Sequence, residues 1–226
     1  MTRTMNARIA GFTFLLYIAA AFASMTLFAR VTSAAGTAAK LAGIAAHASD
    51  VRIVIVLSLI TCFTALVLAV TLYGITRDED NDLALLALSC RVGEGVLSAI
   101  FVLATLGLLW LATSASRAGG PDTAATVALG SFLLKVQDWN TVIGATFFAV
   151  GSTLFSYLLL RGRTVPVPLA WLGVFGSALV VAGLPLQLAG VLHSPVTLLM
   201  WLPVAAFELT VGPWLLIKGA PAPATR

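Results

Sequence analysis

Three charged side chains lie inside long apolar stretches of the sequence and are the residues best suited to chemistry. Arg91 and Glu94 are three positions apart, so on a helix they share a face and can form an ion pair. Glu208 lies in a second apolar stretch, between Pro203 and Pro213. Ionisable residues inside a membrane commonly mark a path or a binding site for a small molecule or a proton. They can also be an ion-pair network that only fixes helix packing, and the sequence leaves both interpretations open.

The composition places these charges in a membrane protein. Of the 226 residues, 60% are hydrophobic and only 10% are charged, and the mean hydropathy is +1.03. Soluble domains are usually about 45–50% apolar. The apolar residues form blocks of about 20, the length that crosses a bilayer as a helix. An ordinary soluble domain is therefore excluded, and a polytopic helical membrane protein is predicted.

The apolar blocks predict an all-α transmembrane bundle of six helices, forming a single integral membrane domain over residues 1–226. The spans are expected at residues 9–29, 50–73, 83–113, 141–160, 168–192 and 196–217. The segment 30–49 between the first two spans is expected to hold a short interfacial helix. Lys and Arg are more frequent in the connections predicted to lie on the same side as the termini than in those on the opposite side, which predicts that both termini lie in the cytoplasm.

Distances along the helices suggest that the buried charges share one depth. Arg91 and Glu94 follow the start of the third span by eight to eleven residues, and Glu208 precedes Lys218 by ten. A helix rises about 1.5 Å per residue, so the three lie at comparable depth. Ser98 continues the polar face of the third span. We expect Arg91, Glu94, Ser98 and Glu208 to form a polar intramembrane network or ligand site, and the two prolines to kink the last helix around Glu208.

A second charged pair lies before the predicted fourth span. Lys135 and Asp138 are also three apart, and Trp139 follows them directly. Tryptophan favours the membrane–water interface. We expect this pair at the extracytoplasmic rim, either as an anchor or as a gate through which a substrate passes.

Known catalytic and metal-binding patterns are missing from the sequence. It has no His-Glu-x-x-His, Walker A or dinucleotide glycine motif, and its two histidines, His47 and His193, lie at or near loops. Cys62 and Cys90 form no zinc or disulfide pattern. No catalytic residue, metal or cofactor is predicted, and enzymatic activity is disfavoured. Basic residues follow the ends of the spans, so the lipid bilayer, and not nucleic acid, is the expected partner.

Short motifs across the chain resemble a known family. They are residues 8–11 (Arg-Ile-Ala-Gly), Arg91 with Glu94, and Glu208 followed by residues 214–219 (Trp-Leu-Leu-Ile-Lys-Gly). They are similar to the bacterial membrane family called domain of unknown function 4386. The resemblance implies the membrane architecture and a location in the inner membrane of a bacterium, and it adds no activity.

Two functions are therefore compatible with the sequence. The first is an integral membrane protein that binds or moves a small molecule or a proton through a polar intramembrane pocket. Six helices are few for a transporter monomer and no inverted repeat is visible, so this function would be easier to accommodate in a homodimer. The alternative is a structural or interaction subunit whose buried charges only lock the helices together.

Overall fold

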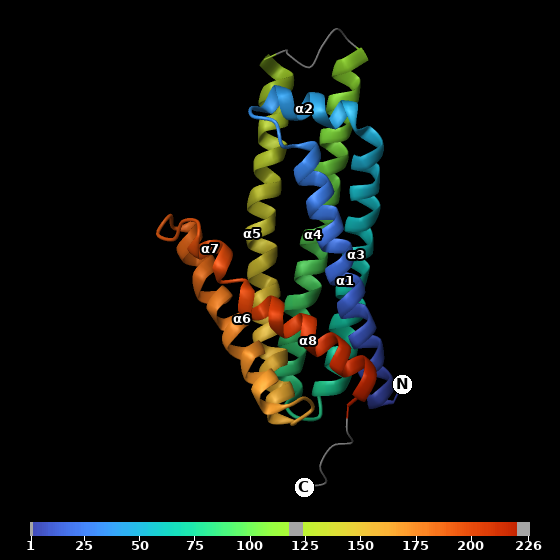
Figure 1. The fold of residues 1–226 in the computed structure, drawn as a ribbon, viewed down its shortest axis with the longest axis vertical. Helices are drawn as coiled ribbons and strands as arrows, with labels where there is room; N and C mark the ends of the chain where they lie inside the picture. Colours follow the sequence, from blue (N-terminus) through green and yellow to red (C-terminus); the bar gives the residue numbers. More distant parts are fainter. Residues whose placement is uncertain (1, 118–123, 221–226) are drawn as a thin grey trace. The chain divides into compact units, whose positions relative to one another are not determined.

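The computed structural model describes residues 2–117 and 124–220, and every regular element in these ranges is a helix. The predicted all-α class is therefore confirmed. Figure 1 shows the elements in chain order. They are α1 (Arg3–Val31), α2 (Thr37–Ala46), α3 (Ala48–Thr76), α4 (Asn81–Arg117), α5 (Ala124–Arg161), α6 (Val167–Leu188), α7 (Val196–Leu199) and α8 (Leu202–Lys218).

Within the described residues, six helical segments are long and apolar enough to cross a membrane. Five are the single helices α1, α3, α4, α5 and α6, and the sixth is the segment Val196–Lys218, which contains α7 and α8. The predicted bundle of six transmembrane helices is confirmed, and the protein is a multi-pass membrane protein. The short helix α2 lies in the segment where an interfacial helix was expected.

The fourth span differs from the prediction in length. Instead of beginning near residue 141, α5 begins at Ala124 and runs without interruption to Arg161. No proline lies between these residues, so nothing removes a backbone donor or ends the helix. The fourth span predicted at 141–160 is the C-terminal part of this longer helix.

The fifth span ends four residues earlier than predicted. Gly190 adopts a left-handed backbone, with φ of 72°, which favours glycine. The amide of Val191 donates to the carbonyl of Leu186 at 2.9 Å, and the amide of Gly190 donates to that of Gln187 at 3.0 Å. This pair of bonds is a Schellman motif, which caps the last carbonyls of a helix, so α6 ends at Leu188.

The chain divides into two compact units, each built from segments that are far apart in the sequence. The first unit contains residues 1–17, 63–95 and 142–226, and the second contains residues 18–62 and 96–141. All of α6, α7 and α8 belong to the first unit, and all of α2 belongs to the second. Each unit has its own hydrophobic cluster, so each is described separately.

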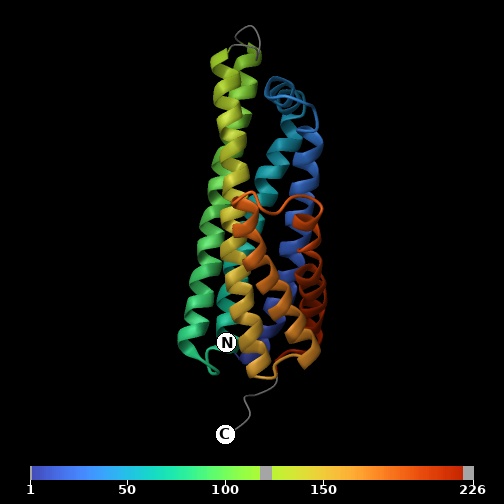
Figure 2. The ribbon, with the colours of Figure 1, turned by 90° about the vertical axis from the view of Figure 1, so that its left-hand side faces the viewer.

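In the first unit, α8 packs closely on two neighbouring helices. It lies beside α6, as Figure 2 also shows, where Gly173 and Gly176 leave room for Phe207 and Val204. On its other side α8 approaches α1 at Gly11, where an added Cβ would lie 2.5 Å from the carbonyl oxygen of Gly212. Small residues allow such backbone contact between membrane helices.

The second unit buries uncharged polar groups that pair with one another. The hydroxyls of Ser24 and Ser58 lie 3.0 Å apart, and Gln137 Nε2 donates to Thr105 Oγ1 at 2.7 Å. Asn140 Nδ2 donates to the carbonyl of Leu97 at 3.0 Å. Each of these bonds joins two helices, so neutral hydrogen bonds add to the apolar packing of this unit.

Candidate functional site

The centre of the candidate site is an ion pair on α4, within the first unit. Arg91 Nη1 lies 2.8 Å from Glu94 Oε2, and the two side chains are only 2% and 6% exposed. Their spacing of three residues places both on one helix face. A buried charge of either sign is costly unless it is paired, so each of these residues requires the other.

Two aromatic rings and a glycine enclose the arginine. The guanidinium carbon of Arg91 lies 4.8 Å from the ring centre of Phe148 on α5 and 5.5 Å from that of Tyr17 on α1, both within the range of cation–π attraction. A Cβ added at Gly151 would lie 3.0 Å from Arg91 Cγ. The glycine therefore leaves the space in which the stem of the arginine lies.

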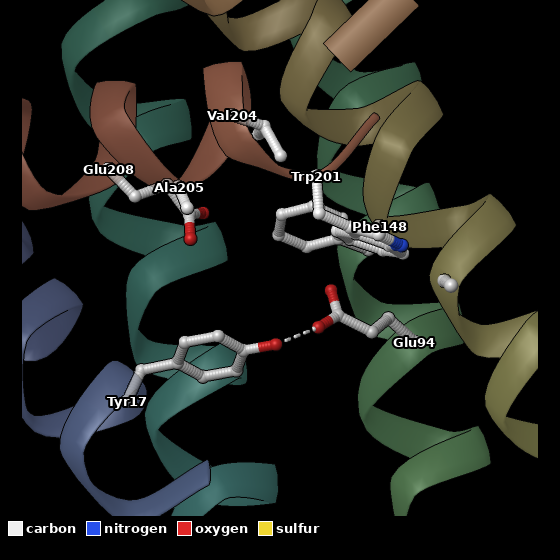
Figure 3. Close-up of a pocket in the computed structure, with 8 residues that line it drawn as sticks. Tyr17, Glu94, Phe148, Trp201, Val204, Ala205 and Glu208 are labelled. Atoms are coloured by element: carbon white, nitrogen blue, oxygen red, sulfur yellow. Dashed lines mark hydrogen bonds between the residues drawn. The ribbon is translucent and has the colours of Figure 1, made fainter. Parts of the chain in front are cut away.

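Tyr17 holds the second oxygen of the glutamate. Its hydroxyl donates to Glu94 Oε1 at 2.7 Å, the bond drawn as a dashed line in Figure 3. Both carboxylate oxygens of Glu94 therefore have partners, one on its own helix and one on α1. The expected partnership of Arg91 and Glu94 includes a tyrosine that sequence reasoning missed. These three residues join α1 and α4, and the contact of Arg91 with Phe148 adds α5.

Glu208 on α8 has no comparable partner. Its residue surface is only 8% exposed, yet its carboxylate makes no hydrogen bond or ion pair with any described residue. In Figure 3 the carboxylates of Glu94 and Glu208 point into the same space. The structure therefore brings Glu208 to the ion pair on α4 and leaves its own charge unmatched by a direct contact.

The space between them is a cleft of about 250 Å³. Its walls are mainly apolar or aromatic, with two carboxylates among them. It is lined by Tyr17, Glu94, Ala145, Phe148, Trp201, Val204, Ala205 and Glu208, seven of which are labelled in Figure 3. Ala205 is exposed, and Trp201 and Tyr17 are half-buried. The cleft is therefore open at this side and is not a sealed cavity.

The break in the last span places Trp201 at the cleft. Pro203 has no amide to donate, so the preceding helix cannot continue through it, and α7 and α8 are separated at Met200 and Trp201. The ring of Trp201 lies 6.1 Å from that of Phe148. This break lies seven residues or more before Glu208, and α8 passes through Glu208 and Pro213 to Lys218. A kink of α8 around Glu208 stays a prediction.

The other predicted site residues lie in the second unit. Ser98 is half-buried on α4 and is not among the described residues that line the cleft. Lys135 Nζ lies 3.9 Å from Asp138 Oδ2 on α5, with both side chains exposed, and 6.0 Å from the ring centre of Trp139. The pair therefore forms in the expected geometry, and its place at a membrane rim stays a prediction.

The described residues contain no group of three or more His, Cys, Asp or Glu side chains that could hold a metal ion. Cys62 and Cys90 form no disulfide within the described residues. The chemistry available in the cleft is that of two carboxylates, a tyrosine hydroxyl and aromatic rings. Such a set can bind and orient a small molecule through charge, hydrogen bonds and ring faces.

Comparison with known proteins supports the resemblance seen in the motifs. No curated protein and no solved structure matches the chain. A family model does match, over residues 9–219, a range that contains Arg91, Glu94 and Glu208. Because this match covers nearly the whole chain, the protein belongs to the family described as Domain of unknown function (DUF4386).

Proposed function

We propose that this membrane protein binds a small molecule in the cleft between Glu94 and Glu208. The observation that carries the proposal is the carboxylate of Glu208, which is buried, faces the cleft and makes no hydrogen bond or salt bridge with any described residue. An unpaired charge in an apolar interior is costly. Membrane proteins keep such residues chiefly where a substrate or ion uses them.

Counting charges supports separate roles for the two glutamates. Arg91 balances Glu94 through direct contact, so the ion pair is neutral as a unit. Glu208 adds a charge that no contacting cation balances. A ligand that enters the cleft would supply the missing partner, and this role requires no rearrangement of the ion pair.

A structural role is the second candidate, and a specific observation favours it for part of the site. Arg91, Glu94 and Tyr17 contact one another across α1 and α4, as a network that locks helices together would. We assign the lock to these three residues and ligand binding to Glu208. If Glu208 were also part of the lock, the protein would be a structural or interaction subunit.

The proposal includes a location in the bacterial inner membrane, with both termini in the cytoplasm. In the first unit Arg3 lies 3.7 Å from Glu79, and Arg161 lies 3.2 Å from Asp80. These contacts join the start of α1 and the end of α5 to the connection between α3 and α4. Basic residues next to span ends favour the cytoplasmic side. A reporter domain that works only in the cytoplasm should be active when it is fused to either terminus. A reporter domain that works only outside the cytoplasm should be inactive at both termini.

Binding can be tested by blocking the cleft. The purified protein would be screened against fragments of similar size but different charge, with the thermal unfolding temperature as readout, because a ligand that binds the folded state raises it. Some fragments should stabilise the natural protein and lose this effect in Ala205→Phe, whose ring would fill the cleft. Ala206→Phe is the matched control, since Ala206 is exposed but does not line the cleft.

Two results would contradict the proposal. In the first, no fragment of any charge stabilises the natural protein. In the second, fragments stabilise Ala205→Phe as well as they stabilise Ala206→Phe, which would place their binding elsewhere on the molecule.

A further inference from the structure

We infer that the ligand is a small organic monocation, a protonated amine whose positive nitrogen pairs with Glu208 while its carbon atoms contact the aromatic walls. This inference rests on the proposed function and specifies the class of ligand. It is carried by the charges that line the cleft, by the rings beside them and by the volume available.

The charges on the cleft wall have one sign. Glu94 and Glu208 line it, and no Lys, Arg or His side chain does so among the described residues. Arg91 lies behind the wall, in contact with Glu94, and is only 1% exposed. An anionic ligand would meet carboxylates with no cation to pair with. A singly charged cation would give a direct counter-charge to Glu208, the one carboxylate of the cleft wall that makes no salt bridge.

The aromatic residues are of the type that attracts cations. Tyr17, Phe148 and Trp201 line the cleft, and the first two already lie close to the guanidinium of Arg91. The faces of aromatic rings carry partial negative charge and bind ammonium groups, most strongly at tryptophan. Trp201 makes no such contact with Arg91 within the described structure, and its ring lines the cleft beside that of Phe148.

The composition and size of the cleft favour an amine over a metal ion. Divalent calcium takes six to eight oxygen ligands, whereas the lining side chains provide two carboxylates and one hydroxyl, set among apolar groups. The volume of about 250 Å³ lies below the range of roughly 300–1,000 Å³ common for drug-sized ligands. An amine carrying one ring or a short alkyl chain matches these dimensions.

Three probes of one shape and different charge test the inference. Benzylammonium, benzyl alcohol and benzoate would be titrated calorimetrically into the full-length protein in phosphatidylcholine nanodiscs, with empty nanodiscs subtracted. We expect benzylammonium to bind at least about tenfold more tightly than benzyl alcohol, as one charge-assisted hydrogen bond would provide. Benzoate should bind more weakly than both.

The variants assign the preference to one carboxylate. Glu208→Gln should remove the tenfold preference for benzylammonium while binding of benzyl alcohol stays within about twofold, because the shape of the side chain is kept. Asp138→Asn is the matched control, since it removes an exposed carboxylate of α5 that does not line the cleft. Ala205→Phe should abolish binding of both probes, which would place them in the cleft. If Glu208→Gln does not fold, the comparison of the three probes on the natural protein still tests the preference for a cation.

The outcomes separate this inference from the proposed function. Equal binding of benzylammonium and benzyl alcohol, or tightest binding of benzoate, would overturn the monocation and leave the binding cleft in place. Displacement of benzylammonium by an equal concentration of sodium chloride, but not of choline chloride, would identify an inorganic cation and also overturn it. Absence of binding by all three probes would count against the proposed function itself.

Discussion

The buried polar side chains that the structure describes in the second unit are all uncharged, whereas the first unit buries Arg91, Glu94 and Glu208. In the second unit, Gln137 donates to Thr105. A polar pair of this kind requires no balance of charge. In the first unit, Arg91 and Glu94 balance each other by direct contact, and Glu208 is left without such a partner.

This difference teaches where a function is to be expected. Neutral hydrogen bonds between membrane helices stabilise packing by a modest amount and need no further explanation. Buried ions are costly and gain little over apolar packing, so stability alone does not account for them. Of the three ions, the two that are paired can be structural, and the unpaired Glu208 is the residue whose presence a ligand would explain.

Breaking the ion pair should have the largest effect on stability. Glu94→Gln keeps the shape of the side chain but leaves the guanidinium of Arg91 buried without a counter-charge. Removing one partner of a buried ion pair typically costs about 3–5 kcal/mol. The free energy of unfolding, measured by titrating the detergent-solubilised protein with sodium dodecyl sulfate, should fall by this amount.

The double variant Arg91→Met/Glu94→Gln provides the control for that experiment. With both charges removed, most of the lost stability should return, because no unpaired ion remains. If the double variant were as unstable as Glu94→Gln, the loss would come from packing around α4 and not from the unpaired arginine.

Adding a methyl group where α1 meets α8 should cause the next largest loss of unfolding free energy. At Gly11 an added Cβ would lie 2.5 Å from the backbone oxygen of Gly212, which cannot move independently of its helix. Gly11→Ala should therefore cost about 1–3 kcal/mol, as overpacking does in other interiors. The same unfolding titration would measure the loss.

Gly107→Ala is the matched variant in the second unit. Its added Cβ would lie 3.3 Å from Leu133 Cδ1, the end of a flexible side chain, and alanine also favours the helix. Little or no loss is expected there. Equal losses at Gly11 and Gly107 would show that the close backbone contact is not specific to the first unit.

The fold could be predicted largely from the sequence because hydrophobic length is a strong signal. Blocks of about 20 apolar residues identify membrane spans whatever their order, and six were found at the right places along the chain. The ends of the spans were predicted less accurately. The long N-terminal extension of α5 contains polar residues such as Lys135 and Gln137, so hydropathy does not reveal it, although the absence of proline does permit a continuous helix.

The site was only partly visible in the sequence. The spacing of Arg91 and Glu94 indicates their pairing. Depth along the helices suggested Glu208 as a neighbour, and it lines the same cleft as Glu94. Tyr17 and Phe148 were missed because contacts between helices depend on rotation and tilt, which the sequence pattern does not report. Tyr17 had one usable signal, a hydroxyl inside an apolar span, since a buried tyrosine hydroxyl normally has a hydrogen-bond partner.

Removing a neutral hydrogen bond from the second unit should lower the free energy of unfolding less than Glu94→Gln or Gly11→Ala does in the first unit. Gln137→Leu removes the bond to Thr105, which typically contributes about 1 kcal/mol. It also removes Gln137 Oε1, a buried oxygen without a hydrogen-bond partner among the described residues. We therefore expect a loss of at most about 1 kcal/mol in the unfolding titration.

Gln137→Glu at the same position sharpens the comparison, because it places a charge in a unit whose described buried polar side chains are all uncharged. No cation contacts Gln137 in the described structure, so the carboxylate would be buried without a partner. Gln137→Glu should therefore lower the free energy of unfolding by more than Gln137→Leu does. A loss no larger than that of Gln137→Leu would show that this unit accepts charge readily and would weaken the distinction between the two units.

Neutralising Glu208 should have the smallest effect on stability, although its side chain is almost as buried as that of Glu94. Glu208→Gln leaves no counter-ion behind, because none contacts the carboxylate in the described structure, and it removes an unpaired buried charge. The free energy of unfolding should therefore stay unchanged or rise by up to about 1 kcal/mol. Asp138→Asn, at an exposed carboxylate, should stay within about 0.5 kcal/mol of the natural protein. A loss at Glu208→Gln as large as that at Glu94→Gln would place Glu208 in the structural lock, because a carboxylate retained only for a ligand adds nothing to the stability of the empty protein.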